Sequence, residues 1–190
     1  MSRSVVLSGC SGGGKSALLA ELARRGHRVI EEPGRRIVVE ETRRGGTAVP
    51  WIDMQAFLWR VVAMAQDDLR SVESYDDTFT FFDRGLVDAM TALADLAGAP
   101  LPHTPGTARA YHRKAFLVPP WPEIYVRDDE RRHDFATASG EYARLLAAYP
   151  ALGYETVILP KVSIVERADL VLNALLVEGP QALRFPCSNL

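Results

Sequence analysis

The residues best suited to chemistry are Gly9 to Ser16, which read GCSGGGKS. They match GxxxxGKS, the pattern of a loop that binds nucleotide phosphates. The apolar run Val5 to Leu7 predicts a strand that leads into the loop, and the periodic pattern from Ala17 to Arg25 predicts a helix that leaves it. The motif therefore has the strand, loop and helix context of a phosphate-binding loop, which a flexible glycine-rich turn lacks.

Each part of this loop has a physical role in holding a polyphosphate. Glycine has no Cβ, so the backbone can turn its N–H groups inward around an anion. The N-terminus of the following helix adds unpaired N–H groups at the same place. We expect Lys15 to reach the β- and γ-phosphates and the Ser16 hydroxyl to ligate Mg²⁺. The predicted nucleotide-binding residues are Gly9, Cys10, Ser11, Gly12, Gly13, Gly14, Lys15, Ser16 and Ala17.

A second candidate element follows the run Thr78 to Phe82, which reads as a buried strand. An acidic residue at the end of such a strand is where P-loop proteins place the carboxylate that holds Mg²⁺, and Asp83 is predicted to have this role. Arg84 would point towards the acceptor or the transferring phosphoryl group and offset its developing charge. The alternative is an Asp-Arg pair on the surface.

A third element ends the predicted second strand, His27 to Glu31. Glu32 and Arg35 follow it directly, and ligands of open α/β sheets bind where the strands end. Glu32 is therefore a candidate catalytic and substrate-binding residue, and Arg35 a candidate substrate contact. An exposed acidic turn is the alternative. The charged and glycine-rich segment 37–50 is expected to end a helix and to form a mobile loop that covers the substrate.

Two further segments are expected to border the nucleotide. The dense charges after the predicted fourth strand, Ala115 to Val118, suggest a lid that brings arginines onto the phosphates. Arg127 and Arg131 are candidate catalytic residues of this lid and Arg132 a candidate nucleotide contact, unless the run is simply a solvated face. The loop that contains Lys161 follows the predicted fifth strand, Thr156 to Leu159, and would border the base.

The rest of the chain predicts helices that cover the sheet. Apolar residues keep a helical period from about Trp51 to Ser71, and this spacing favours an interior position for Trp51 and Trp59 over stacking on a base. Further helical segments are 86–97 and 135–148, and a last helix opens at Ser163, which forms a capping box with Glu166.

Composition places the chain among ordinary globular proteins. The 190 residues suit one domain, and the net charge of -2 gives no bulk argument for nucleic acid. The two cysteines have no metal or disulfide spacing, and there is no signal peptide or membrane span, so we expect a cytoplasmic protein. We expect one P-loop domain over 1–178, with the lid near 127–134, and a tail over 179–190. The oligomeric state is open.

The runs GCSGGGKS, EEPGRR, FFDRG, FLVPPWPEIYVRDDERR and LPKVSIVER, in this order, resemble a family of small bacterial P-loop proteins described as AAA-type ATPases or ATP-binding proteins. The resemblance covers nearly the whole chain and extends to nucleoside and nucleotide kinases and to the nicotinamide-riboside kinase domain of bifunctional NAD regulators. It implies a P-loop NTPase fold: a three-layer α/β/α sandwich with a parallel five-stranded sheet in the order 2-3-1-4-5.

Such kinases carry a carboxylate after the second strand, an acidic residue followed by Arg after the third, and arginines in a lid. The resemblance thus implies kinase roles for Glu32, for Asp83 and Arg84, and for Arg127, Arg131 and Arg132. A mechanical AAA+ motor usually has Glu after the Asp at this strand end, where the Glu activates water. Arg84 stands in that position here, and 190 residues leave no room for the further domains of such a motor. We therefore expect a kinase-like protein.

Three functions remain in competition. The first is transfer of the γ-phosphoryl group of ATP, with Mg²⁺, to a small-molecule acceptor such as a nucleoside or nucleotide; GTP is the alternative donor. The second is a nucleotide-dependent binding switch with slow hydrolysis and no small-molecule acceptor. The third, modification of a nucleic acid, would need a basic track that is not evident in the sequence.

Overall fold

The computed structural model describes residues 3–9, 12–72, 78–102, 108–124 and 135–176. Cys10 and Ser11 of the predicted phosphate loop, the predicted lid with Arg127, Arg131 and Arg132, and the tail 179–190 lie outside the described residues. In chain order the elements are β1 (Ser4–Gly9), α1 (Lys15–Arg24), β2 (Arg28–Ile30), α2 (Pro33–Arg44), α3 (Met54–Val72), β3 (Thr80–Asp83), α4 (Leu86–Leu96), β4 (Lys114–Val118), η1 (Pro122–Ile124), α6 (Phe135–Ala151), β5 (Glu155–Ile158) and α7 (Ile164–Leu176).

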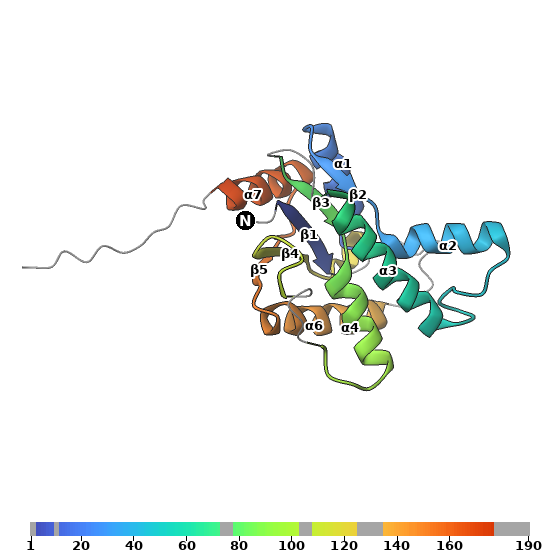
Figure 1. The fold of residues 1–190 in the computed structure, drawn as a ribbon. Coiled ribbons are helices and arrows are strands. Elements are labelled where there is room, and N and C mark those ends of the chain that lie inside the picture. Colours follow the sequence, from blue (N-terminus) through green and yellow to red (C-terminus); the bar gives the residue numbers. More distant parts are fainter. Residues whose placement is uncertain (1–2, 10–11, 73–77, 103–107, 125–134, 177–190) are drawn as a thin grey trace, which may run out of the picture.

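The strands form one parallel sheet in the order β2-β3-β1-β4-β5. This confirms the predicted fold class and strand order. β1 lies at the centre, with β3 and β4 hydrogen-bonded on either side, so the ends of these three strands meet at one edge of the sheet (Figure 1). Because the strands are parallel, Gly9, Asp83 and Val118 end at that same edge.

Helices cover both faces of the sheet, because side chains along a strand point alternately to opposite faces. On one face Val5 and Leu7 pack with residues of α1 and α7. On the other face Val6 packs with residues of α3, α4 and α6. Both layers are visible around the sheet in Figure 1. The α/β/α sandwich thus has two separate cores, one on each side of the sheet.

Helix α3 shows where the sequence interpretation was wrong. Trp59 is 54% exposed, as is Trp51 in the turn before the helix, so the expected interior positions are not found. The buried side chains of the helix are Leu58, Val61, Val62, Ala65 and Val72. At about 100° per residue Trp59 lies outside the arc that these residues span. The run is amphipathic, and Trp59 belongs to its outer face.

Two helix starts illustrate how local signals set the boundaries. Helix α2 begins at Pro33, with Glu32 as its N-cap, because proline suits a first helical position that needs no N–H donor. The predicted capping box is confirmed before α7: the Ser163 backbone N–H donates to Glu166 Oε2 (3.0 Å), and the Glu166 backbone N–H donates to Ser163 Oγ (3.3 Å).

The segment after α2 is attached to the helix through a buried carboxylate. Glu41 is 1% exposed and accepts hydrogen bonds from the Ala48 N–H (3.1 Å) and from the guanidinium groups of Arg44 and Arg60. Glu41 therefore connects α2, the loop after it and α3. Whether this loop covers a substrate stays a prediction.

Candidate functional site

The predicted phosphate loop begins at Gly9, the last residue of β1, which lies close to Val118 of β4. Gly9 has φ +106°, and a Cβ there would lie 2.3 Å from the Val118 carbonyl oxygen. Only glycine fits this position, for both its backbone angle and its space. Gly14 then caps α1 with φ 84° in the left-handed region. These two glycines stand at the two ends of the loop, one ending β1 and the other capping α1.

Lys15 lies buried in this loop, at the first residue of α1. Its side chain is folded back so that Nζ donates to the Gly9 carbonyl oxygen at 3.3 Å. Burial lowers the pKa of Lys15, and the positive charge of Arg84 lowers it further. An anion in the loop would oppose both effects, because it stabilises the charged ammonium. The environment of Lys15 therefore suits a side chain that binds a phosphate group.

Asp83 ends β3 next to the loop, in register with Leu7 of β1. The residue is 7% exposed, and its Oδ1 has no hydrogen-bond partner among the described residues. Burial raises the pKa of Asp83, while the positive charge of Lys15 opposes this shift. An orphaned carboxylate oxygen beside a phosphate loop has the chemistry that Mg²⁺ prefers, and the exposed Ser16 hydroxyl in the first turn of α1 supplies a second oxygen. Both residues fit the predicted magnesium site.

Arg84 occupies an unusual backbone conformation directly after Asp83. Its φ is +59°, the only positive value of a non-glycine residue in the described chain, while its N–H donates to the Leu7 carbonyl oxygen at 2.9 Å. Such a conformation costs about 1–3 kcal/mol and persists only where the surroundings hold it. In this conformation the guanidinium group lies beside the carboxylates of Glu32 and Glu141.

Two carboxylates that are far apart in the sequence, those of Glu32 and Glu141, hold this guanidinium group. Arg84 Nε lies 3.4 Å from Glu32 Oε1, and both terminal nitrogens donate to Glu141 of α6, one of them at 3.1 Å. Burial opposes the charge of Arg84, but Glu141 and Glu32 outweigh it and raise its pKa well above the ordinary value. Glu32 also accepts a hydrogen bond from Arg35 Nε at 3.0 Å.

The structure therefore brings Lys15, Glu32, Asp83 and Arg84 to one place, with Arg35 at its rim. Sequence reasoning did not find Glu141, because a single acidic residue in an amphipathic helix is usually solvated. The sequence contains no signal that would have paired Glu141 with Arg84.

A buried polar network lies beneath this cluster. Asp88 of α4 accepts hydrogen bonds from Ser8 Oγ of β1 and from the Tyr149 hydroxyl of α6, the latter at 2.8 Å. Burial raises the pKa of Asp88, against the opposing influence of Arg84. The network ties the strand that precedes the phosphate loop to the helix that carries Glu141. It was not predicted from the sequence.

The segments after β4 and β5 approach each other beside the phosphate loop. Lys161 Nζ lies 3.8 Å from Glu123 Oε2, so the loop predicted to border the base adjoins η1, the short helix after β4. Arg167 of α7 is fully buried and donates from Nη1 to the Gly13 carbonyl oxygen at 2.8 Å. Arg167 was not among the predicted site residues, although it falls on the apolar arc of the last helix with Ala168 and Val171, and this position is a signal of burial in the sequence.

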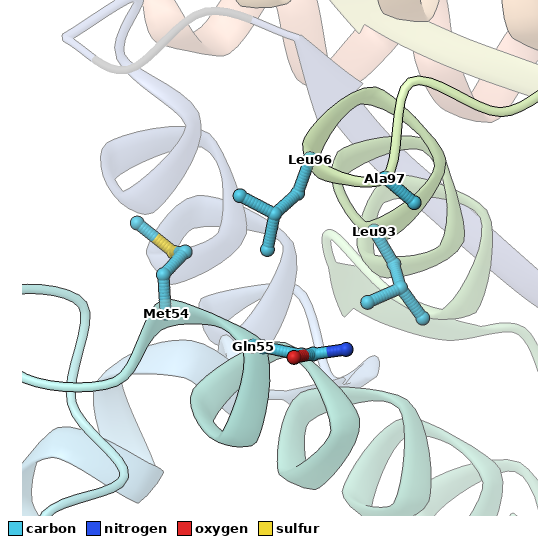
Figure 2. A pocket seen from close by; sticks show the side chains of 5 residues that line it. All are labelled: Met54, Gln55, Leu93, Leu96 and Ala97. Carbon is cyan, nitrogen blue, oxygen red and sulfur yellow. The ribbon is translucent and has the colours of Figure 1, made fainter.

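A small cavity of about 250 Å³ lies elsewhere, between α3 and α4 (Figure 2). It is lined by Met54, Gln55, Leu93, Leu96 and Ala97, and it contains none of the predicted site residues. Its mainly apolar lining offers no group that would bind a phosphate. We therefore do not assign it to the site.

The described ranges hold no group of three or more His, Cys, Asp or Glu side chains placed to bind a metal. Within the same ranges, no helix combines the length and apolar character that crossing a bilayer requires.

Comparisons with known proteins agree with this architecture. The AAA domain family matches residues 4–167. Among solved structures, shikimate kinase from Acinetobacter baumannii, in complex with shikimate, shares 14% identity over 91% of this chain and 92% of its own, with a TM-score of 0.56. Deoxyadenosine kinase from M. mycoides, solved with dATP, shares 12% identity over 91% of this chain and 98% of its own, with a TM-score of 0.58.

The same enzyme with dCTP gives 13% identity, the same coverage of both chains and a TM-score of 0.55. The comparison with curated proteins found no match. At these identities the solved structures establish the fold alone. Because the family match spans most of the sequence, this chain belongs to the AAA domain family, within which it has the fold of P-loop kinases.

Proposed function

We propose that this protein is a kinase that transfers the γ-phosphoryl group of ATP to a hydroxyl or phosphate oxygen of a small-molecule acceptor, such as a nucleoside or nucleotide. The observation that carries the proposal is the position of Arg84. It stands where a hydrolytic P-loop motor has a water-activating Glu, and it is held between Glu32 and Glu141 beside Lys15. The site thus offers positive charge for a transferring phosphoryl group.

Each residue has a specific task in the proposed reaction. Lys15 and the loop N–H groups bind the β- and γ-phosphates, while Ser16 and Asp83 hold Mg²⁺, which neutralises phosphate charge when bound. Where the acceptor is a hydroxyl, the Glu32 carboxylate accepts its proton; an ionised phosphate oxygen needs no base. The acceptor oxygen forms a bond to the γ-phosphorus, the bond from that phosphorus to the β,γ-bridging oxygen breaks, and ADP leaves with the electron pair.

Arg84 stabilises the charge on the transferring group, and Arg35 at the rim contacts the acceptor. Arg127 and Arg131 of the predicted lid would add charge to the same group, and Arg132 and Lys161 would contact the nucleotide. ATP is the proposed donor, with GTP as the alternative. A cytoplasmic location, as the cysteine content predicts, suits an enzyme that consumes ATP.

The test is a panel of nucleosides, nucleotides and vitamin ribosides, incubated with MgATP or MgGTP and analysed for phosphorylated products. We expect one acceptor class to be phosphorylated and Lys15→Ala to abolish the reaction. Glu32→Gln should lower kcat by about 100-fold or more, because the acceptor proton loses its base. Glu40→Gln, an exposed glutamate of the same helix α2, is the matched control and should stay near wild type.

Hydrolysis of ATP at the same rate with and without every acceptor would overturn the kinase proposal. Tight nucleotide binding without any turnover would do the same. Either result would favour the nucleotide-dependent switch.

A further inference from the structure

Helix α7 contains a charged residue, Arg167, whose side chain is buried. Arg167 has 0% of its surface exposed and lies among Ala168, Val171 and Leu175, the apolar residues that attach α7 to the sheet. A guanidinium group cannot lose its charge in a protein, and removing it from water is costly. The burial of Arg167 therefore costs free energy, which other contacts of its guanidinium group must offset.

The contacts of Arg167 join the phosphate loop to the segments after β4 and β5. Nη1 donates to the Gly13 carbonyl oxygen at 2.8 Å, and Nε donates to the Pro160 carbonyl oxygen, after β5, also at 2.8 Å. The guanidinium carbon lies 4.9 Å from the ring centre of Trp121, after β4. One side chain thus connects the loop with the ends of two strands.

The hydrogen bond from Arg167 to Gly13 satisfies a carbonyl group of the phosphate loop. In a loop whose N–H groups converge on an anion, the carbonyl groups point outward and need donors elsewhere. Gly13 is buried, so water is a poor substitute for such a donor. Arg167 supplies this donor to the Gly13 carbonyl group.

The charge of Arg167 is not balanced within the described chain. No carboxylate pairs with it there, its Nη2 has no hydrogen-bond partner there, and burial lowers its pKa. A polyphosphate bound in the neighbouring loop would bring the missing negative charge close to it. The buried cation is thus better compensated with a nucleotide than without one.

From these contacts we infer that Arg167 is a positioning residue for nucleotide binding: it holds the phosphate loop at Gly13 and links it to the segments after β4 and β5. The inference rests on nucleotide binding, which is one part of the proposed function, and does not depend on the acceptor. Arg167 acts through the Gly13 carbonyl group and does not touch the nucleotide.

The experiment measures the dissociation constants of MgATP and of magnesium tripolyphosphate for the full chain and its variants by calorimetry. Tripolyphosphate has no base, so it reports on the phosphate loop alone. Arg167→Met should weaken both ligands by about tenfold or more, because the Gly13 carbonyl group loses its donor. Arg167→Lys, which keeps the charge but cannot donate in two directions from a planar group, should fall between Arg167→Met and wild type.

Arg25→Met is the matched control. Arg25 joins α1 to α7 through Asp169 at 2.6 Å, yet it contacts neither the phosphate loop nor the strand ends in the described structure. Its variant should bind both ligands within about twofold of wild type, as expected for the loss of a partly exposed ion pair.

Thermal unfolding of the same variants distinguishes positioning from a purely structural role. If Arg167→Lys and Arg167→Met lower the melting temperature but bind MgATP and tripolyphosphate with wild-type affinity, the inference is wrong. If Arg167→Met does not fold, the result from Arg167→Lys decides. The outcome is independent of the acceptor panel, because a protein that phosphorylates no acceptor still shows these differences in binding.

Discussion

Arg84, in the turn after β3, and Glu141, in α6, form a bidentate ion pair, although they are 57 positions apart in the sequence. Such a pair fixes the plane of the guanidinium group as well as its position. Glu32 contacts the same group through Nε at 3.4 Å. The helix that follows the predicted lid therefore sets the orientation of the arginine proposed to assist phosphoryl transfer.

Replacing Glu141 should reduce turnover more than nucleotide binding. In Glu141→Gln one of the two accepting oxygens becomes an NH2 group, which can only donate, so the paired contact with both terminal nitrogens of Arg84 is lost and the guanidinium group loses its fixed orientation. We expect kcat to fall by about 10- to 100-fold while the dissociation constant of MgATP changes by less than about threefold. Steady-state kinetics with the acceptor from the panel, together with calorimetry, measures both quantities.

Glu155→Gln is the control for this variant, since Glu155 pairs with Arg113 at 3.7 Å on the exposed edge strand. It should leave both quantities unchanged. If Glu141→Gln impaired MgATP binding and kcat to the same degree, an orienting role for Glu141 would be excluded.

The same pair predicts a pH dependence of stability. Burial alone would raise the pKa of Glu141, but Arg84 outweighs burial and holds it below the ordinary value of 4.5. Between these two pKa values the unfolded chain binds more protons than the folded protein. The contribution of the pair is therefore fully present above about pH 4.5 and is lost as the pH falls through the lower, folded value.

The difference in unfolding free energy between wild type and Glu141→Gln should be constant from pH 7 to about pH 5 and shrink at lower pH. Urea denaturation at a series of pH values measures it. Groups that titrate equally in both proteins cancel in the difference. A difference that grew towards acid pH would contradict the assigned direction of the pKa shift.

Asp83→Asn tests the predicted magnesium site. Asparagine keeps the size of the side chain but loses the charge, and burial already disfavours the charge of Asp83. We therefore expect a folded protein of wild-type stability or better, which binds ATP but gains about tenfold less affinity from added Mg²⁺. Titration of ATP with and without Mg²⁺ gives this ratio.

The exposed Asp95 of α4 supplies the control Asp95→Asn, which should show the wild-type response to Mg²⁺. Were the Mg²⁺ response of Asp83→Asn also that of wild type, Asp83 would not hold the metal.

Gly9→Ala should damage the phosphate loop beyond the effect of backbone strain. The new Cβ would lie 2.3 Å from the Val118 carbonyl oxygen, so β1 and β4 would have to separate. Gly26→Ala isolates the strain, because Gly26 has φ +90° with nothing within 4 Å of the added Cβ. We expect Gly26→Ala to cost about 1–3 kcal/mol of stability and to bind nucleotide normally.

Gly9→Ala should cost more stability than Gly26→Ala and bind MgATP at least about tenfold more weakly, as measured by denaturation and calorimetry. Equal effects of the two variants would show that the close approach to β4 is unimportant.

Much of the fold was predictable because its signals are local. The GxxxxGKS motif, the apolar strands and the Ser163 capping box depend on residues near each other in the sequence, and the resemblance to P-loop kinases supplied the strand order. The expectation that was wrong concerned the exposure of Trp51 and Trp59, which both lie on the surface. A helical period of apolar residues shows that one face of a helix is buried, but it does not exclude aromatic residues from the exposed face.

The sequence by itself predicted a phosphate loop at Gly9 to Ser16 and a buried strand that ends next to Asp83, with Arg84 directly after it. Only the tertiary structure decided which side chains meet there. Arg84 finds Glu141 across 57 positions, and Arg167 reaches Gly13 across 154. These pairings depend on how α6 and α7 pack on opposite faces of the sheet, and packing between distant segments leaves no pattern in the spacing of single residues.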